Sequence, residues 1–117
     1  MNRDESRNEL GLVRIHRNVI ASISSIAALE TEGVKRVGRD LRGVLLGSLG
    51  QNSFSAIKVD ISKSEEVRVD IPLIIKYGYN IPDIATRVQE NVRQALEKMS
   101  NLFVKEINVT VRGIERG

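Results

Sequence analysis

The chain has 117 residues, of which 41% are hydrophobic and 28% are charged, and these values are typical of one soluble globular domain. It contains no cysteine, which excludes a disulfide framework and a thiolate metal site. The formal net charge of +3 comes from 18 basic and 15 acidic residues that are spread along the chain. The sequence therefore has no continuous basic segment of the kind that binds nucleic acid.

The first nine residues, MNRDESRNE, are polar and have no apolar periodicity, which predicts a disordered tail over residues 1–9. They lack the apolar core of a signal peptide, and no apolar run approaches the roughly 20 residues needed to span a bilayer. We therefore expect a single domain over residues 10–117, located in the cytoplasm. Any membrane association would be peripheral, through a partner.

The first part of the domain predicts a strand, a helix and a second strand. Residues 10–15 are expected to form a strand because Val13 and Ile15 alternate. A helix is predicted over residues 17–29, ended by Gly33 and followed by a short strand at 34–37. The apolar stripe of this helix is assigned to Val19, Ile23, Ile26 and Ala27, and it is widened by Ile20 and Ala28.

Residues 38–55 are predicted to be the most mobile internal segment, because four glycines punctuate it and no periodicity is sustained. The segment GSLG at 47–50 matches the GxxG loop of KH-type RNA-binding domains, but it lacks their basic residues, and we interpret it as a flexible loop. Leu45, Leu46 and Leu49 form an apolar cluster within the segment. They are a candidate loop contact for a partner, or they fold back over the core.

A strand–helix–strand unit over residues 67–114 has the clearest periodicity. Six apolar residues from Val67 to Tyr77 alternate, and residues 56–62 are expected to pair with this strand as an antiparallel hairpin. Asn80 precedes a predicted helix as its N-cap. The apolar stripe of that helix contains Ile81, Ile84, Ala85, Val88, Val92, Ala95, Leu96 and Met99. Residues 103–112 alternate again and should return parallel to the first strand.

The predicted order is β-α-β-β-β-α-β. This order indicates an α+β fold, a two-layer sandwich in which a mixed sheet carries both helices on one face. Alternation directs a second set of side chains to the opposite, open face. The candidate interaction surface on that face consists of Arg68, Asp70, Ile74, Lys76, Thr110 and Arg112.

Catalytic chemistry is not indicated by the residue types present. His16 is the single histidine, and its position at the expected start of a helix favours a surface role. No nucleophile motif accompanies it. We therefore expect neither an enzyme nor a cofactor, a metal site or a small-molecule substrate.

Several segments resemble the alkaline shock protein family, also called envelope stress response proteins. The resemblance covers residues 10–114 and is most specific at KYG (76–78), NIP (80–82), VQENV (88–92) and INV (107–109). The chain departs from the family at His16, where a Ser or Thr N-cap is usual, and at Asn101, where Gly is usual. Both departures concern helix capping.

The resemblance implies a non-catalytic structural or interaction protein of the bacterial envelope stress response. It implies self-association and docking to a membrane-anchored or metabolic partner. An alternative is a small nucleic-acid-binding or regulatory domain, for example in the control of fatty-acid synthesis. The scarcity of aromatic residues, 3% of the chain, makes base stacking and thus nucleic-acid binding the less favoured interpretation.

Overall fold

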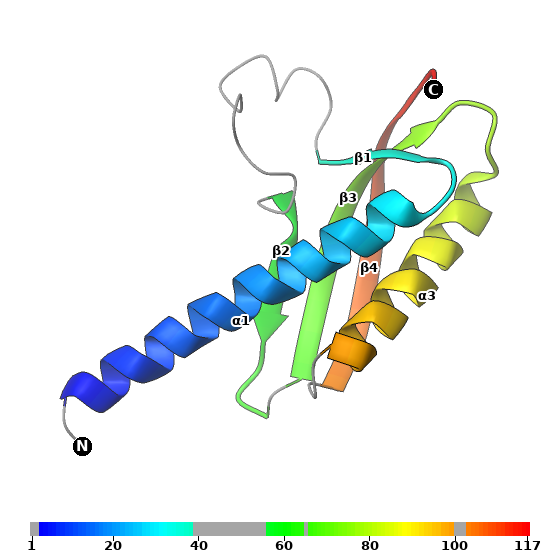
Figure 1. The fold of residues 1–117 in the computed structure, drawn as a ribbon. Helices are drawn as coiled ribbons and strands as arrows, with labels where there is room; N and C mark the ends of the chain where they lie inside the picture. Colours follow the sequence, from blue (N-terminus) through cyan, green and yellow to red (C-terminus); the bar gives the residue numbers. More distant parts are fainter. Residues whose placement is uncertain (1–2, 39–55, 65, 100–102) are drawn as a thin grey trace, which may run out of the picture.

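The computed structural model describes the backbone of residues 3–38, 56–64, 66–99 and 103–117, with side chains described from His16 onward. The elements follow one another along the chain as shown in Figure 1. They are α1 (Arg3–Glu30), β1 (Val34–Val37), β2 (Lys58–Ile61), β3 (Glu66–Lys76), α3 (Ile81–Met99) and β4 (Phe103–Glu115).

Strand β3 is the centre of the sheet. β4 pairs with it in parallel along its whole length, from Glu66↔Phe103 to Lys76↔Glu115. β1 and β2 are both antiparallel to β3, at its C-terminal and N-terminal parts respectively. They therefore share the edge that β4 does not occupy. The expected hairpin and the expected parallel return are confirmed, and the sheet is mixed.

Both helices pack against one face of this sheet, as predicted for an α+β sandwich (Figure 1). Val69, Ile71 and Leu73 alternate inward on β3 and have no exposed surface. They belong to one core cluster with the buried residues of α3, which are Ile84, Val88, Val92 and Leu96. Burying these branched side chains contributes about 1.5–3 kcal/mol each, so the contact between α3 and the sheet contributes substantially to stability.

The N-terminal region differs from the prediction. Residues 10–15 form no strand, and residues 3–9 form no disordered tail, because both segments lie within α1. Two alternating residues were too few to define a strand. Leu12, Ile15, Val19 and Ile23 are spaced by three, four and four residues, which continues the helical period instead. His16 consequently lies within α1 and is not its N-cap.

The buried side of α1 also differs from the predicted stripe. Ile20, Ala27 and Ala28 are buried, whereas Val19 and Ile26 are exposed. The buried side includes two hydroxyl groups, which bond to backbone carbonyls of the helix and so keep a partner when they are buried. The Oγ of Ser24 donates to the Ile20 carbonyl at 2.7 Å, and the Oγ1 of Thr31 donates to the Ala27 carbonyl at 3.1 Å.

Helix α3 begins as predicted. The Asn80 Oδ1 accepts a hydrogen bond from the Asp83 N–H at 3.0 Å, which is the expected N-cap contact. Two residues predicted to be buried are exposed. Tyr77 is 76% exposed because β3 ends at Lys76, and Met99 is 73% exposed at the last residue of the helix.

Candidate functional site

The open face of the sheet carries charged and polar side chains in rows across the strands. Arg68, Asp70, Thr110 and Arg112 are all exposed, as predicted. The register places Arg68 opposite Asp60 on β2, and Asp70 opposite Lys58. Opposite signs therefore alternate across this face, and opposite charges on neighbouring strands stabilise the pairing modestly.

Ion pairs at one end of the sheet extend this pattern. The Arg68 Nε lies 3.8 Å from a Glu106 carboxylate oxygen, and the Lys105 Nζ lies 3.0 Å from Glu66. All four side chains remain 34–53% exposed, so each pair contributes at most about 1 kcal/mol.

Ile74, the one apolar residue of the predicted surface, has no exposed area and cannot contact a partner. It lies opposite Arg36 on β1 and Gly113 on β4. Its Cδ1 is 3.3 Å from the point where a Cβ of residue 113 would stand. The absent side chain of Gly113 thus leaves room for Ile74 to lie against the sheet. The prediction that Ile74 is an exposed contact is wrong.

Lys76 is half-buried rather than projecting freely from the open face. Its backbone N–H donates to the Gly33 carbonyl at 2.8 Å. Beside it, Glu115 at the end of β4 accepts a hydrogen bond from Arg36 at 2.7 Å, and its other carboxylate oxygen lies 3.7 Å from Lys35. These contacts join β1, β3 and β4, so this end of the sheet is fixed by its own charges.

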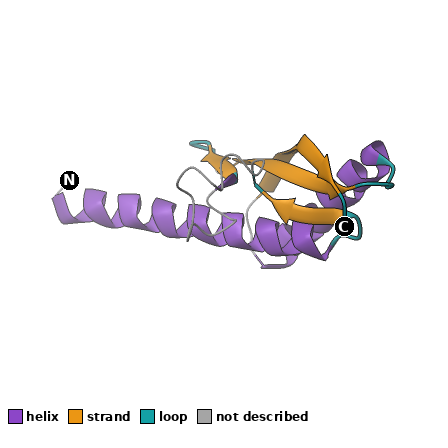
Figure 2. Cartoon of the chain, turned by 90° about the horizontal axis from the view of Figure 1, so that it is seen from above, coloured by secondary structure: helices purple, strands orange, loops and turns teal. Residues whose placement is uncertain are grey.

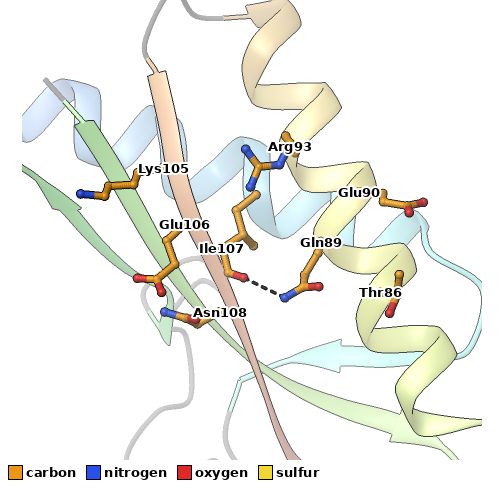
Figure 3. A pocket seen from close by; sticks show the side chains of 8 residues that line it. All are labelled: Thr86, Gln89, Glu90, Arg93, Lys105, Glu106, Ile107 and Asn108. Carbon is orange, nitrogen blue, oxygen red and sulfur yellow. Dashed lines mark hydrogen bonds between the residues drawn. The ribbon is translucent and has the colours of Figure 1, made fainter.

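A groove of about 440 Å³ lies between α3 and β4 (Figure 3). α3 contributes four polar residues and β4 contributes a run of four, and Ile107 is the single apolar member. The lining residues are Thr86, Gln89, Glu90, Arg93, Lys105, Glu106, Ile107 and Asn108. Small-molecule sites are mostly apolar with a few polar groups. The lining of this groove is instead mostly polar, so it does not have the composition of a small-molecule site.

Two side chains of the groove already have structural partners. The Gln89 Nε2 donates to the Ile107 carbonyl at 2.9 Å, and the Arg93 guanidinium donates to the Val104 carbonyl at 2.8 Å. Figure 3 shows the first of these bonds crossing the groove. Because β4 is an edge strand, these bonds occupy backbone acceptors that would otherwise be open to another strand.

The remaining sequence-predicted residues are placed as follows. Leu45, Leu46 and Leu49, together with the GxxG segment and Asn101, lie outside the described residues. His16 is exposed on α1. Within the described part of the chain, no three acidic or histidine side chains are grouped as metal ligands, and no helix is both long and apolar enough to cross a membrane.

Three exposed apolar residues of α1 were not predicted as a surface. Val19, Ile26 and Leu29 are 46%, 58% and 43% exposed. The signal was present in the sequence, because Leu12, Val19 and Ile26 recur every seven residues. This signal was hard to recognise because α1 also carries a second apolar row at helical spacing. That second row includes Ile20 and Ala27, and it is the row that the sheet covers.

Comparison with known proteins agrees with the resemblance seen in the sequence. The model of the alkaline shock protein 23 family, described by a cell envelope-related function, matches residues 5–116. The uncharacterized protein YqhY of Bacillus subtilis is 34% identical over 113 residues, covering 96% of this chain and 83% of that protein. YloU of the same organism is 26% identical, covering 94% and 93% of the two chains. Spy1535 of Streptococcus pyogenes is also 26% identical, covering 90% and 80%.

Solved structures with the same fold include variants of the MamM C-terminal domain. One of them superposes with a TM-score of 0.51 at 12% identity, covering 84% of this chain and 98% of that domain. A second variant gives a TM-score of 0.50, covering 84% and 95%. At this level of identity the likeness concerns the fold.

Proposed function

This chain belongs to the alkaline shock protein 23 family, and from that premise we propose that it is a non-catalytic interaction protein of the bacterial cell envelope. It self-associates and docks to a membrane-anchored partner protein from the cytoplasmic side. The open sheet face is the surface that docks to this partner. In this proposal the protein acts through contacts between protein surfaces and does not carry out chemistry on a substrate.

One observation carries the proposal: a sheet with both described helices, α1 and α3, on one face and mixed charges on the other. Arg68 and Asp70 project from β3, while Thr110 and Arg112 continue the surface on β4. A surface with both signs of charge suits a protein with a complementary pattern. A phosphate backbone would favour positive charge alone.

Because Ile74 is buried, the residues of the predicted surface that can reach a partner are charged or polar. Such contacts weaken as salt rises, since the Debye length is about 8 Å at physiological ionic strength. They also give fast, specific association more than high affinity. We therefore expect a salt-sensitive complex with its partner.

The test is affinity capture with the tagged full-length chain from solubilised membranes and from soluble extract of the native organism. The sheet-face variant carries Arg68→Glu and Arg112→Glu. A matched control carries Lys63→Glu and Arg87→Glu, which reverse two exposed charges elsewhere on the protein. We expect the wild type and the control to retain one integral membrane protein that the sheet-face variant loses.

Equal capture by the folded sheet-face variant would contradict the assignment of this surface. Retention of nucleic acid in place of protein, with a steep loss between low and moderate salt, would favour the regulatory alternative. Circular dichroism of each variant shows whether the loss of capture follows from unfolding.

A further inference from the structure

The charges of the open sheet face are matched at the N-terminal end of β3. Every basic side chain that the structure describes at this end has an acidic neighbour across the strands. The pairs are Lys58 with Asp70, Arg68 with Asp60 and Glu106, and Lys105 with Glu66. This part of the face, here named the balanced half, therefore presents both signs of charge in nearly equal number.

The same face has an excess of positive charge at the C-terminal end of β3. There β1, β3 and β4 lie side by side, as Figure 1 shows, and the strands are joined by pairing. The charged side chains of this region, here named the basic end, are Lys35, Arg36, Lys76, Arg112 and Glu115. Four basic side chains and one acidic side chain give the basic end a net charge of +3.

The register places the two arginines of the basic end on either side of β3. Val111 packs against the core, so the alternation of β4 directs Arg112 to the open face. Arg112 directly precedes Gly113, which lies opposite Ile74, and Arg36 lies opposite Ile74 from β1. Neighbouring strands are about 4.8 Å apart, so the two arginine backbones are roughly 10 Å apart across the sheet.

Glu115 shows how the basic end holds a carboxylate. Its Oε2 accepts a hydrogen bond from the Arg36 guanidinium at 2.7 Å, and its Oε1 lies 3.7 Å from the Lys35 Nζ. Both cations come from β1 and reach across β3 to the end of β4. The guanidinium is still short of acceptors, because the Arg36 Nε is buried and has no hydrogen-bond partner among the described residues.

Lys76 and Arg112 are the cations of the basic end that a partner can use. Within the described part of the chain, neither of them forms an ion pair. Arg112 is exposed, and Lys76 is half-buried with its stem against the end of the chain, since its Cδ is 3.3 Å from the Cβ position of Gly117. An incoming anion can therefore pair with both charges without breaking an existing ion pair.

We propose that the basic end binds an acidic segment of the membrane-anchored partner, an extended stretch whose Asp or Glu residues pair with Lys76 and Arg112. The inference rests on the docking in the proposed function, and it names the chemistry of the partner at that surface. Carboxylates suit this region because a guanidinium can bind them through two parallel hydrogen bonds. The alternate side chains of an extended segment are about 7 Å apart, which allows two of them to meet cations on neighbouring strands.

The balanced half favours a protein segment over a broad anionic surface. It carries four acidic and three basic side chains, so a membrane of anionic lipid or a nucleic-acid backbone laid along the face would meet carboxylates there. Placing like charges together across an interface is unfavourable. A short acidic segment can contact the basic end alone, and the rest of the partner can then match the mixed charges beside it.

The first test measures binding of a defined acidic probe by fluorescence anisotropy. The probe is a labelled decapeptide of alternating Ser and Glu, and its neutral counterpart alternates Ser and Gln. We expect the wild type to bind the acidic peptide, with an affinity that falls as salt rises, and not to bind the neutral one. Lys76→Gln/Arg112→Gln, the basic-end variant, should bind the acidic peptide about tenfold more weakly.

The matched control is Lys58→Gln/Arg68→Gln in the balanced half. It removes the same amount of positive charge from the same face, so it separates a local site from the effect of net charge. We expect its affinity for the acidic peptide to stay within about twofold of the wild type. Equal weakening in the two variants would overturn the inference, because the peptide would then respond to overall charge alone.

The second test repeats the capture of the membrane partner with the same two variants. The basic-end variant should retain less of the integral membrane protein than the wild type, and the balanced-half variant should retain as much. An excess of the acidic peptide should release the captured protein, whereas the neutral peptide should not. Circular dichroism of each variant shows that a loss of binding does not follow from unfolding.

The outcomes distinguish a failure of this inference from a failure of the proposed function. If the wild type captures the partner and the folded basic-end variant captures it equally well, the inference is wrong while docking stands. If the wild type captures no integral membrane protein, the docking is wrong and the inference fails with it. Sedimentation of the wild type with vesicles of phosphatidylglycerol, but not of phosphatidylcholine, without binding to the acidic peptide would assign the basic end to lipid and overturn the inference.

Discussion

Gly33 shows how a single residue determines the junction between α1 and β1. Its φ is +97°, a conformation that L side chains rarely adopt. A Cβ at this position would also lie 2.6 Å from the Ile84 Cδ1 and 2.9 Å from the Tyr79 ring. The chain therefore needs glycine here for two reasons: the turn itself and the close approach of α3.

Gly78 separates these two reasons, because its φ is +98° but a Cβ there would meet nothing within 4 Å. We predict that Gly78→Ala lowers the free energy of unfolding by about 1–2 kcal/mol, the cost of the conformation alone. Gly33→Ala should cost more, by roughly a further 1–3 kcal/mol for the steric overlap. Urea denaturation of the two variants measures this difference. Equal losses would show that Ile84 and Tyr79 move aside freely.

Ile74 provides a second prediction at the scale of a residue. It has no exposed surface although it lies on the sheet face away from the helices. Ile74→Glu should therefore remove several kcal/mol of the roughly 5–15 kcal/mol that stabilise a domain, because it buries an unpaired carboxylate. Arg68→Glu, on the same strand and the same face but exposed, should change stability by less than about 1 kcal/mol. Thermal melts followed by circular dichroism compare the two. Similar melting temperatures would mean that Ile74 is accessible to water.

At the scale of the elements, α3 depends on its first turn and its buried row. Asn80→Ala removes the acceptor for the Asp83 N–H and should destabilise the protein by about 1 kcal/mol. Asn80→Asp retains an acceptor and is the control, with a change of a few tenths of a kcal/mol. Urea denaturation measures both. An unchanged midpoint for Asn80→Ala would show that the cap contributes nothing in this protein.

The elements also show which features the sequence could predict. β3, α3 and β4 were predicted because each has one apolar face and one polar face, so the period has a single interpretation. α1 has apolar residues on two sides. Val19 and Ile26 follow one row at helical spacing, while Ile20 and Ala27 follow another. Spacing cannot tell which row the sheet covers and which a partner could cover, so the predicted stripe was partly wrong.

The candidate site was predicted to a similar degree. Alternation along β3 and β4 correctly directed Arg68, Asp70, Thr110 and Arg112 to the open face. It could not reveal that Ile74 is covered, because this depends on its neighbours across the strands. Arg36 and Gly113 come from segments distant in sequence, and the register shift in β4 between Val111 and Gly113 determines which of its residues lies opposite Ile74.

At the scale of the whole molecule, the two-layer architecture separates two kinds of surface. The helix layer presents three exposed apolar residues of α1, which are Val19, Ile26 and Leu29, and the sheet layer presents a polar face of mixed charge. Apolar contacts persist at high salt, whereas contacts between exposed charges weaken. We predict that raising the salt concentration from 0.05 M to about 0.5 M releases the membrane partner from the charged sheet face. Affinity capture at the two concentrations tests this. Undiminished capture of the partner at the higher concentration would contradict the assignment of the sheet face as the docking surface.

The claim that the protein acts by docking at the envelope is tested most directly by fractionating cells of the native organism. Three strains produce the wild type, the Arg68→Glu/Arg112→Glu variant or the Lys63→Glu/Arg87→Glu control at equal levels. The share of each protein that sediments with membranes is then measured. We predict that the wild type and the control sediment with membranes, while the sheet-face variant stays in the supernatant. A wild type found wholly in the supernatant, or a folded sheet-face variant that sediments with membranes as the wild type does, would contradict the account.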